Sequence, residues 1–182
     1  KKYELRQSID YYEEKFGGLN SLEYSINSGK ENGINDPEYL QKVNDLVEFM
    51  RNQPKVTSVR SYTDVVKRLN QNFNNDDQSF YKIPSSELEA AQYLFLYELS
   101  LGYGLDLTDQ INVDKSALRV TTNVANATTK EFLDLDKKIQ GWFAENAPEL
   151  MSKSTGPSQV FSQISSRDVP AMLKGTGFAL IG

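Results

Sequence analysis

The first part of the chain shows a strand pattern, a helix pattern and a second strand pattern in succession. Leu22, Tyr24 and Ile26 alternate with polar residues, which predicts a half-buried strand. Asp36 and Pro37 then supply an N-cap and a first helical residue. The helix that follows carries one apolar stripe, formed by Leu40, Val43, Leu46, Val47 and Met50. The next proline prevents the helix from continuing, and "KVTSVRS" predicts a second strand.

The same order of patterns returns after residue 114. "SALRVTTNV" alternates again, with Leu118, Val120, Thr122 and Val124 on one side. A capping box, Thr128 to Glu131, begins a helix, and "ELMSKST" is a weaker strand candidate after it. The stripe of this helix is Phe132, Leu135, Ile139, Trp142 and Phe143. We expect Trp142 to be largely buried against the sheet, so that Trp142→Ala costs about 3–5 kcal/mol.

Two strand–helix–strand units, at 19–61 and 115–155, predict an α+β fold. The arrangement that suits them is a ferredoxin-like split βαβ sandwich, with four antiparallel strands and two helices on one face. A small parallel sheet of another α/β type is the alternative.

A helical insertion is predicted between the two halves, over 62–114. "YTDVVKRLNQNF" has a helical pattern, and Ser86 to Glu89 is a capping box at the start of "SELEAAQYLFLYELS". This second helix is apolar nearly all round, so we expect burial on more than one side. The contacts expected to hold it are Leu88, Leu94, Phe95 and Leu99. Acidic residues outnumber basic ones by 9 to 3 in the segment, so its charge composition differs from that of the segments on either side.

Both ends of the chain differ from an ordinary domain. Residues 1–18 predict a short leading helix, "SIDYYEEKFGG", and the chain opens at Lys1 without Met. Residues 156–182 begin as a helix and grade into an apolar run from Ala171 to Gly182, shorter than the ~18 residues of a membrane span. We interpret this run as the first third of a truncated transmembrane helix; a last strand or helix packed on the domain's own core is the alternative. The chain is then expected to be an extracytoplasmic piece of a larger membrane protein.

Composition excludes several classes of function. The chain contains neither His nor Cys, which rules out a Ser-His-Asp triad, a Cys-His pair and a zinc site with His ligands. The formal net charge of -5 argues against a nucleic-acid partner. Asp106, Asp109 and Asp114 lack the spacing and the glycine of an EF-hand loop, so a solvated loop is predicted. We therefore expect no catalytic residue, no metal site and no cofactor.

The ordered set of motifs resembles a known family. It resembles the first large extracytoplasmic loop, between transmembrane helices one and two, of exporters of the RND superfamily in the MMPL-like branch. The motifs that carry the resemblance, in order, are "FGG", "LNSLEYSINSG", "INDPEYLQKVNDLVEFMRNQPKVTSVRSYTDVVKRLN", "ELEAAQYLFLYELS", "DKSALRVTTNV" and "TGPSQVFSQI". The match runs from about Tyr11 to Gly182, nearly the whole chain.

The resemblance implies a porter-type domain in the bacterial periplasm, as part of an inner-membrane protein. Members of the family export lipids or other hydrophobic compounds, driven by proton flow through acidic residues of membrane helices that lie outside this chain. A second, related periplasmic loop packs against the first. The implied partners are therefore that loop, the membrane helices of the same protein and a lipid-like substrate; a homo-oligomer is left open.

The sequence and its resemblance suggest three candidate functions. The first is such an exporter domain, which binds and gates without chemistry of its own. The second is a stand-alone soluble module that binds a ligand or a protein and shares the ferredoxin-like plan. The third, an enzyme, is disfavoured because no paired carboxylates have a sequence context that would separate their pKa values. The candidate substrate contacts are Tyr93, Phe95 and Tyr97, for which core packing is the alternative.

Overall fold

The computed structural model describes residues 7–8, 11, 20–102, 107–125, 127–166 and 172. Its strands are β1 (Asn20–Asn27), β2 (Val56–Arg60), β3 (Ala117–Val124) and β4 (Ser154–Thr155). Its helices are α2 (Pro37–Arg51), α3 (Tyr62–Phe73), α4 (Glu87–Ser100) and α5 (Thr129–Asn146), with short 3-10 helices at Gly33–Asn35, Gln78–Phe80 and Pro148–Leu150. Residues 157–166 are also helical.

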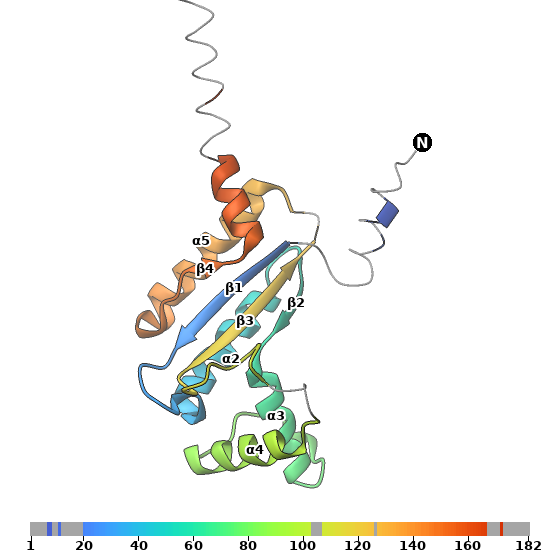
Figure 1. Cartoon of the computed structure of the whole chain (residues 1–182), viewed down its shortest axis with the longest axis vertical. Helices are drawn as coiled ribbons and strands as arrows, with labels where there is room; N and C mark the ends of the chain where they lie inside the picture. The colour runs from blue at the N-terminus through green and yellow to red at the C-terminus, as the bar shows by residue number, and fades with distance from the viewer. Residues whose placement is uncertain are drawn as a thin grey trace, which may run out of the picture.

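The strands form one four-stranded sheet in the order β2-β3-β1-β4, and every neighbouring pair is antiparallel. Helix α2 joins β1 to β2, and α5 joins β3 to β4 (Figure 1). The two predicted units therefore interleave, because β1 of the first unit pairs along its whole length with β3 of the second. The α+β prediction is confirmed, and the parallel-sheet alternative is wrong.

One face of the sheet carries the core. Leu22, Tyr24 and Ile26 of β1 are fully buried, and the alternating positions of β3 face the same way. The α2 stripe packs on them as predicted, with Leu40, Val43, Leu46, Val47 and Met50 all buried. The buried Thr122 hydroxyl donates to Met50 Sδ at 3.2 Å, so this polar group has a partner within the core.

The predicted starts of α2 and α5 are confirmed. Asp36 accepts a hydrogen bond from the Glu38 amide at 2.9 Å at the start of α2. At the start of α5, Thr128 and Glu131 form the reciprocal capping box. The Lys55 ammonium, 2.7 Å from Glu131, lowers the pKa of that carboxyl to about 2. Each helix therefore begins at a side chain that satisfies its first free amides.

The two edge strands are less regular than their sequences indicate. In β2, a register shift between Val56 and Ser58 lets Val56 and Val59 both turn inward. The predicted strand "ELMSKST" is a strand only at Ser154–Thr155, because its first residues form a 3-10 helix. Strand β4 pairs with β1 only at Glu23 and Tyr24.

The expectation for Trp142 is wrong. Phe132, Leu135 and Ile139 are buried as predicted. However, the aromatic residue that packs against the sheet is Phe143, which is 1% exposed. The Phe143 ring lies 6.1 Å from the ring of Tyr24. Trp142 is partly buried at the margin, where its ring lies 6.1 Å from that of Phe49 on α2. Adjacent residues point about 100° apart on a helix, so only one of the two can face the sheet directly.

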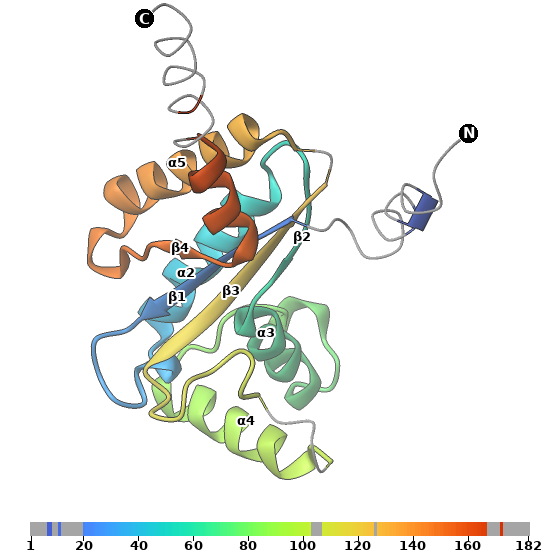
Figure 2. The same ribbon diagram turned by 45° about the horizontal axis from the view of Figure 1, so that its top comes forward.

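The segment between β2 and β3 is largely helical, as predicted. Helices α3 and α4 lie together at one end of the molecule, away from α5 (Figures 1 and 2). The contacts expected for α4 are corrected, however. Leu94 is buried, but Leu88 and Leu99 are each 68% exposed and Phe95 is 59% exposed. The segment returns to the sheet before β3, where Ile111 forms an antiparallel bridge with Leu118.

The predicted leading helix and the apolar run at 171–182 lie outside the described residues, apart from isolated helical positions at 7–8, 11 and 172. Among the helices that the structure describes, none has the length and apolar character needed to cross a membrane.

Candidate functional site

The three predicted contact residues of α4 do not share one surface. The Tyr93 ring stacks on Phe73 of α3 at 4.9 Å, and its hydroxyl lies 3.4 Å from Asn70 Oδ1. Tyr97 is partly buried and packs against the core. Phe95 points outward. Residues two apart on a helix lie on different sides, so these residues cannot line a groove together within this domain.

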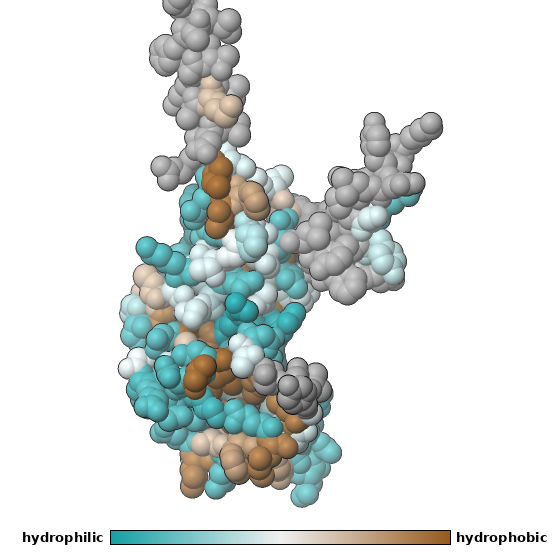
Figure 3. All heavy atoms as spheres, viewed as in Figure 1, coloured by the Kyte–Doolittle hydropathy of each residue, from teal (hydrophilic) through white to brown (hydrophobic). Residues whose placement is uncertain are grey.

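The structure instead shows a continuous apolar face on the outside of α4. Ala90 and Leu94 are the buried residues through which the helix packs. On the opposite side Leu88, Phe95, Leu96 and Leu99 are exposed, with Gln92 among them. Figure 3 shows hydrophobic atoms gathered over this end of the molecule. We call this set of five residues the α4 outer face.

Acidic side chains border the α4 outer face without entering it. Glu98 pairs with Lys115 at 2.8 Å, which ties the far end of α4 to the start of β3. At the near end Ser86 caps the helix by accepting from the Glu89 amide at 3.3 Å. The Ser85 hydroxyl donates to the Glu89 carboxylate at 2.9 Å and lowers its pKa. Because Glu89 reaches Ser85 and not the Ser86 amide, the predicted capping box is only half formed.

The sequence could have indicated which side of α4 turns inward. Ala90 is the small residue that permits close approach to another helix, and Leu94 and Tyr97 follow it at the spacing of one helix face. Leu88, Phe95 and Leu99 lie on the opposite side. The apolar residues all round the helix concealed this difference, so hydrophobicity alone could not locate the exposed side.

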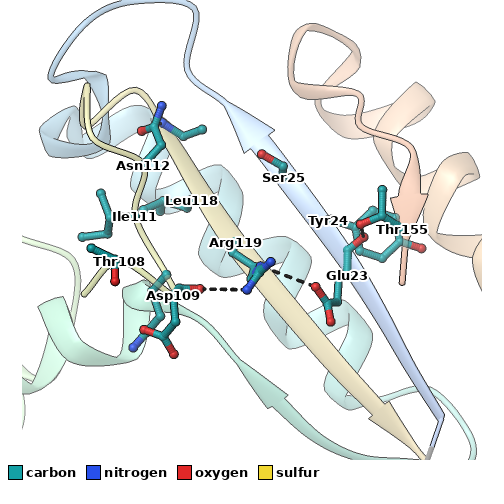
Figure 4. A pocket seen from close by; sticks show the side chains of 12 residues that line it. Glu23, Tyr24, Ser25, Thr108, Asp109, Ile111, Asn112, Leu118, Arg119 and Thr155 are labelled. Carbon is teal, nitrogen blue, oxygen red and sulfur yellow. Dashed lines mark hydrogen bonds and ion pairs between the residues drawn. The ribbon is translucent and has the colours of Figure 1, made fainter. Parts of the chain in front are cut away.

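A small pocket lies on the face of the sheet opposite the core, with a volume of about 210 Å³ (Figure 4). Arg119 of β3 projects into it and lies between Glu23 of β1, at 3.4 Å, and the main-chain oxygen of Asp109, at 3.5 Å. Two nitrogens of the guanidinium, Nε and Nη1, therefore already face acceptors. Around it the pocket is lined by hydroxyl, amide and aliphatic groups from the 108–112 loop and β1, among them Ser25, Thr108, Asn112 and Ile111.

A buried polar network joins three elements on the other side of the sheet. The Tyr24 hydroxyl donates to Asp136 Oδ1 of α5 at 2.7 Å, and Gln159 Nε2 donates to Asp136 Oδ2 at 2.9 Å. Gln159 is 3% exposed, although Val160 and Phe161 beside it are exposed. Burial, reinforced by the Asp136 charge, raises the pKa of Tyr24, so the phenol stays protonated as the donor. The 157–166 helix is thus held to the domain partly through a polar contact.

Sequence patterns gave no indication of this network. Its members lie on three separate elements, and Tyr24 and Asp136 are 112 residues apart. Each of them alone fits an ordinary strand or helix position.

The acidic loop before β3 is used for local structure in the described residues. Asn112 Oδ1 accepts hydrogen bonds from the amides of Ser116 and Ala117, which closes a turn. The Asp109 carboxylate faces Arg60 at 3.8 Å, and Asp106 lies outside the described residues. Among the residues that the structure describes, no three acidic side chains gather as metal ligands would.

Neither a family model, nor a curated protein, nor a solved structure matches this chain.

Proposed function

We propose that this chain is a periplasmic porter-type domain of a proton-driven exporter of the RND superfamily, MMPL-like branch, and that its core is ferredoxin-like. The observation that carries the proposal is the interleaved sheet. Two βαβ units share one antiparallel sheet in the order β4-β1-β3-β2, with α2 and α5 on the same face. This is the strand order of a split βαβ sandwich, and the resemblance of the sequence implies the same arrangement.

The position of the helical insertion agrees with the proposal. Helices α3 and α4 leave the sheet between β2 and β3, which is the junction of the two βαβ units. An insertion at this point adds an interaction surface without interrupting either unit. The sheet and its helices then act as a rigid support for surfaces that contact other parts of a larger protein.

The 157–166 helix has a defined role in the proposal. In an exporter of this kind it leads toward the second membrane helix. The hydrogen bonds of Asp136 with Tyr24 and Gln159 connect it to the centre of the sheet. A displacement of the membrane helix would then reach β1 and α5 directly, which is the coupling that gating requires.

The proposal assigns binding and gating to this domain, and no chemistry. The substrate class is a lipid or another hydrophobic compound, and the partner is the second periplasmic loop. Since Tyr93 stacks on Phe73, Tyr97 packs against the core and Phe95 turns outward, these three residues alone do not enclose a ligand. A complete substrate pocket therefore requires surfaces from outside this domain.

The parent reading frame and the full-length protein test the proposal. We expect apolar segments of ~20 residues on both sides of this piece. In proteoliposomes, the full-length protein should export a fluorescent lipid when a proton gradient is applied, and a protonophore should abolish the export. A frame without such segments, or export that is indifferent to the gradient, would reject the exporter.

Titration of the isolated domain separates the exporter from the stand-alone module. A fluorescent fatty-acid or sterol probe should bind weakly or not at all, because a partial pocket buries less area while the entropy cost of association is unchanged. Tight, saturable binding would favour the stand-alone ligand-binding module. Release of product from an ester, phosphate or glycoside substrate would instead make the chain an enzyme.

A further inference from the structure

The 157–166 helix turns a polar side toward the domain and an apolar side outward. Gln159 is 3% exposed and donates to Asp136 of α5 at 2.9 Å. Val160, Phe161 and Ile164 are 55%, 69% and 48% exposed. These three residues lie together on the side away from Gln159, and we call them the 160–164 face. A surface helix normally buries its apolar side, so the inverted pattern indicates that another element covers this face.

The small size of the 160–164 face favours a segment of the same chain over a separate protein. A stable interface buries about 800 Å² on each partner, and the exposed parts of three side chains provide less than about half of that. A segment of the same chain needs less area, because a short linker holds it at an effective concentration in the millimolar range. The covering element is therefore expected nearby in the same chain.

The topology of the sheet brings one such segment to the 157–166 helix. Strand β4 pairs antiparallel with β1, so the chain preceding β1 and the chain following β4 leave the sheet at the same end. The Ser21 amide at the start of β1 donates to Ser158 Oγ at 3.4 Å. Figure 2 shows the helix that follows β4 beside α5. The residues that precede β1 therefore join the sheet next to the start of this helix.

Residues 8–18 lie largely outside the described residues, and their sequence has the matching pattern. "SIDYYEEKFGG" predicts a helix with Ile9, Tyr12 and Phe16 on one side and two glycines at its end. At 1.5 Å per residue, this helix is about 16 Å long and the 157–166 helix is about 15 Å long. The glycines allow the chain to reverse before β1, so the two helices can lie antiparallel.

The charges of the two sides are complementary. The 8–18 segment contains three acidic residues and one lysine, a net charge of -2. Beside the last turn of the 157–166 helix, a hollow of about 410 Å³ is lined by Lys130, Asp134 and Lys137 of α5, which carry a net charge of +1. An antiparallel arrangement brings Asp10 to this end of the helix, where the opposite charges attract.

We propose that residues 8–18 form a helix that packs antiparallel on the 160–164 face. Phe16 lies against Val160, and Tyr12 lies against Ile164. The segments that precede β1 and follow β4 then move as one unit, held to the sheet through Ser158 and Gln159. The inference is independent of the exporter proposal, because it rests on the 157–166 helix, its contacts with the sheet and the sequence of residues 8–18.

Cysteine cross-linking within the 182-residue chain tests the contact, since the chain contains no Cys. A disulfide needs Cα atoms within about 7 Å. Under mild oxidation, Tyr12→Cys combined with Ile164→Cys should form an intramolecular disulfide at least tenfold faster than Tyr11→Cys combined with Ile164→Cys. Tyr11 is the matched control, because it is the same residue type one position away and points about 100° from Tyr12 on a helix. Mass spectrometry of unreduced peptides identifies the disulfide.

Hydrogen exchange tests the 160–164 face itself. An isolated helix of this length is marginal in water, so slow exchange of the amides of residues 9–16 requires docking. These amides should exchange at least tenfold more slowly than in an unfolded peptide, and Ile164→Glu should remove the protection. Leu96→Glu on α4 is the matched control and should leave the protection unchanged, because Leu96 is 45% exposed, close to the value for Ile164. Circular dichroism checks that both variants are folded.

Three results would overturn the proposal. Equal rates of disulfide formation for the two cysteine pairs would exclude a defined contact between the segment and the face. Amides of residues 9–16 that exchange as in an unfolded peptide, or protection that survives Ile164→Glu, would exclude docking on the 160–164 face. Co-sedimentation with phosphatidylglycerol vesicles that Ile164→Glu abolishes, together with unprotected amides at 9–16, would assign the face to a lipid surface.

Discussion

The Tyr24 hydroxyl joins the sheet to a charged group on α5. It donates to Asp136 Oδ1 at 2.7 Å, and the residue is fully buried. Tyr24→Phe should lower the free energy of unfolding by about 2 kcal/mol, because a hydrogen bond to a carboxylate is stronger than one to a neutral acceptor. Urea denaturation followed by circular dichroism measures the change.

Tyr39→Phe is the matched control for this prediction. The Tyr39 hydroxyl also donates at 2.7 Å from a buried position, but its acceptor is the main-chain oxygen of Ile26. The expected loss is about 1 kcal/mol, the usual net value for a neutral hydrogen bond. Equal losses for the two variants would show that the Asp136 charge adds nothing to the Tyr24 contact.

The neighbouring residues Trp142 and Phe143 of α5 should differ in their contribution to the free energy of unfolding. Phe143 is 1% exposed beside Tyr24, so Phe143→Ala should cost about 3–5 kcal/mol. Trp142 lies at the margin against Phe49, and Trp142→Ala should cost about 1–2 kcal/mol because less of its surface is buried. Urea unfolding of the two variants measures these losses of stability. A larger loss for Trp142→Ala than for Phe143→Ala would contradict the packing described for α5.

At the scale of the elements, α4 is attached to the rest of the protein through one side only. Leu94 is 1% exposed and Leu99 is 68% exposed on the same helix. Leu94→Ala should cost about 2–5 kcal/mol through the cavity it leaves, and Leu99→Ala should stay within about 0.5 kcal/mol. The comparison is made by thermal unfolding of both variants at low protein concentration. If Leu99→Ala proves the more harmful, the helix is turned the other way.

A helix or strand could be oriented from the sequence when one of its sides was clearly more hydrophobic than the other. The stripe of α2 and the alternation of Leu22, Tyr24 and Ile26 have one apolar side only, and the structure buries that side. Helix α4 is apolar on both sides, so hydrophobicity alone does not reveal its orientation, and only the small Ala90 distinguishes the inward side in the sequence. Strand β4 is short because the 3-10 helix at Pro148–Leu150 uses residues that seemed available to the strand.

The candidate surface was less predictable than the fold, for a related reason. Tyr93, Phe95 and Tyr97 form a group in the sequence because they are aromatic and close together. Their positions on the helix separate them, and the stacking of Tyr93 on Phe73 could be known only once α3 and α4 were placed together. The polar network of Tyr24, Asp136 and Gln159 likewise exists only because the two βαβ units interleave.

For the whole molecule, three buried tyrosine hydroxyls determine how stability changes at alkaline pH. Burial raises the pKa of Tyr24, Tyr39 and Tyr62 in the folded protein. Below about pH 10 both states keep these protons, and their contribution to stability is constant. Above about pH 10 the unfolded chain releases them while the folded protein retains them, so the free energy of unfolding falls, by at most about 4 kcal/mol per pH unit.

Urea titrations between pH 8 and pH 11 measure this dependence. Tyr24→Phe should remove about a third of the slope above pH 10, because one of the three groups is lost. A stability that stays level to pH 11 would mean that these hydroxyls ionise as readily in the folded protein as in the unfolded chain.

The interleaving of β1 and β3 also governs when the protein can fold during its synthesis. The paired residues of these two central strands are roughly 100 positions apart, a separation typical of slow-folding topologies. At about 5–20 residues per second, β3 follows β1 out of the ribosome by roughly 5–20 s. During that interval Leu22, Tyr24 and Ile26 can contact α2, but β1 lacks both of its strand partners. The nascent chain therefore presents an unpaired, apolar strand for seconds, and a chaperone that binds such strands would meet it in that interval.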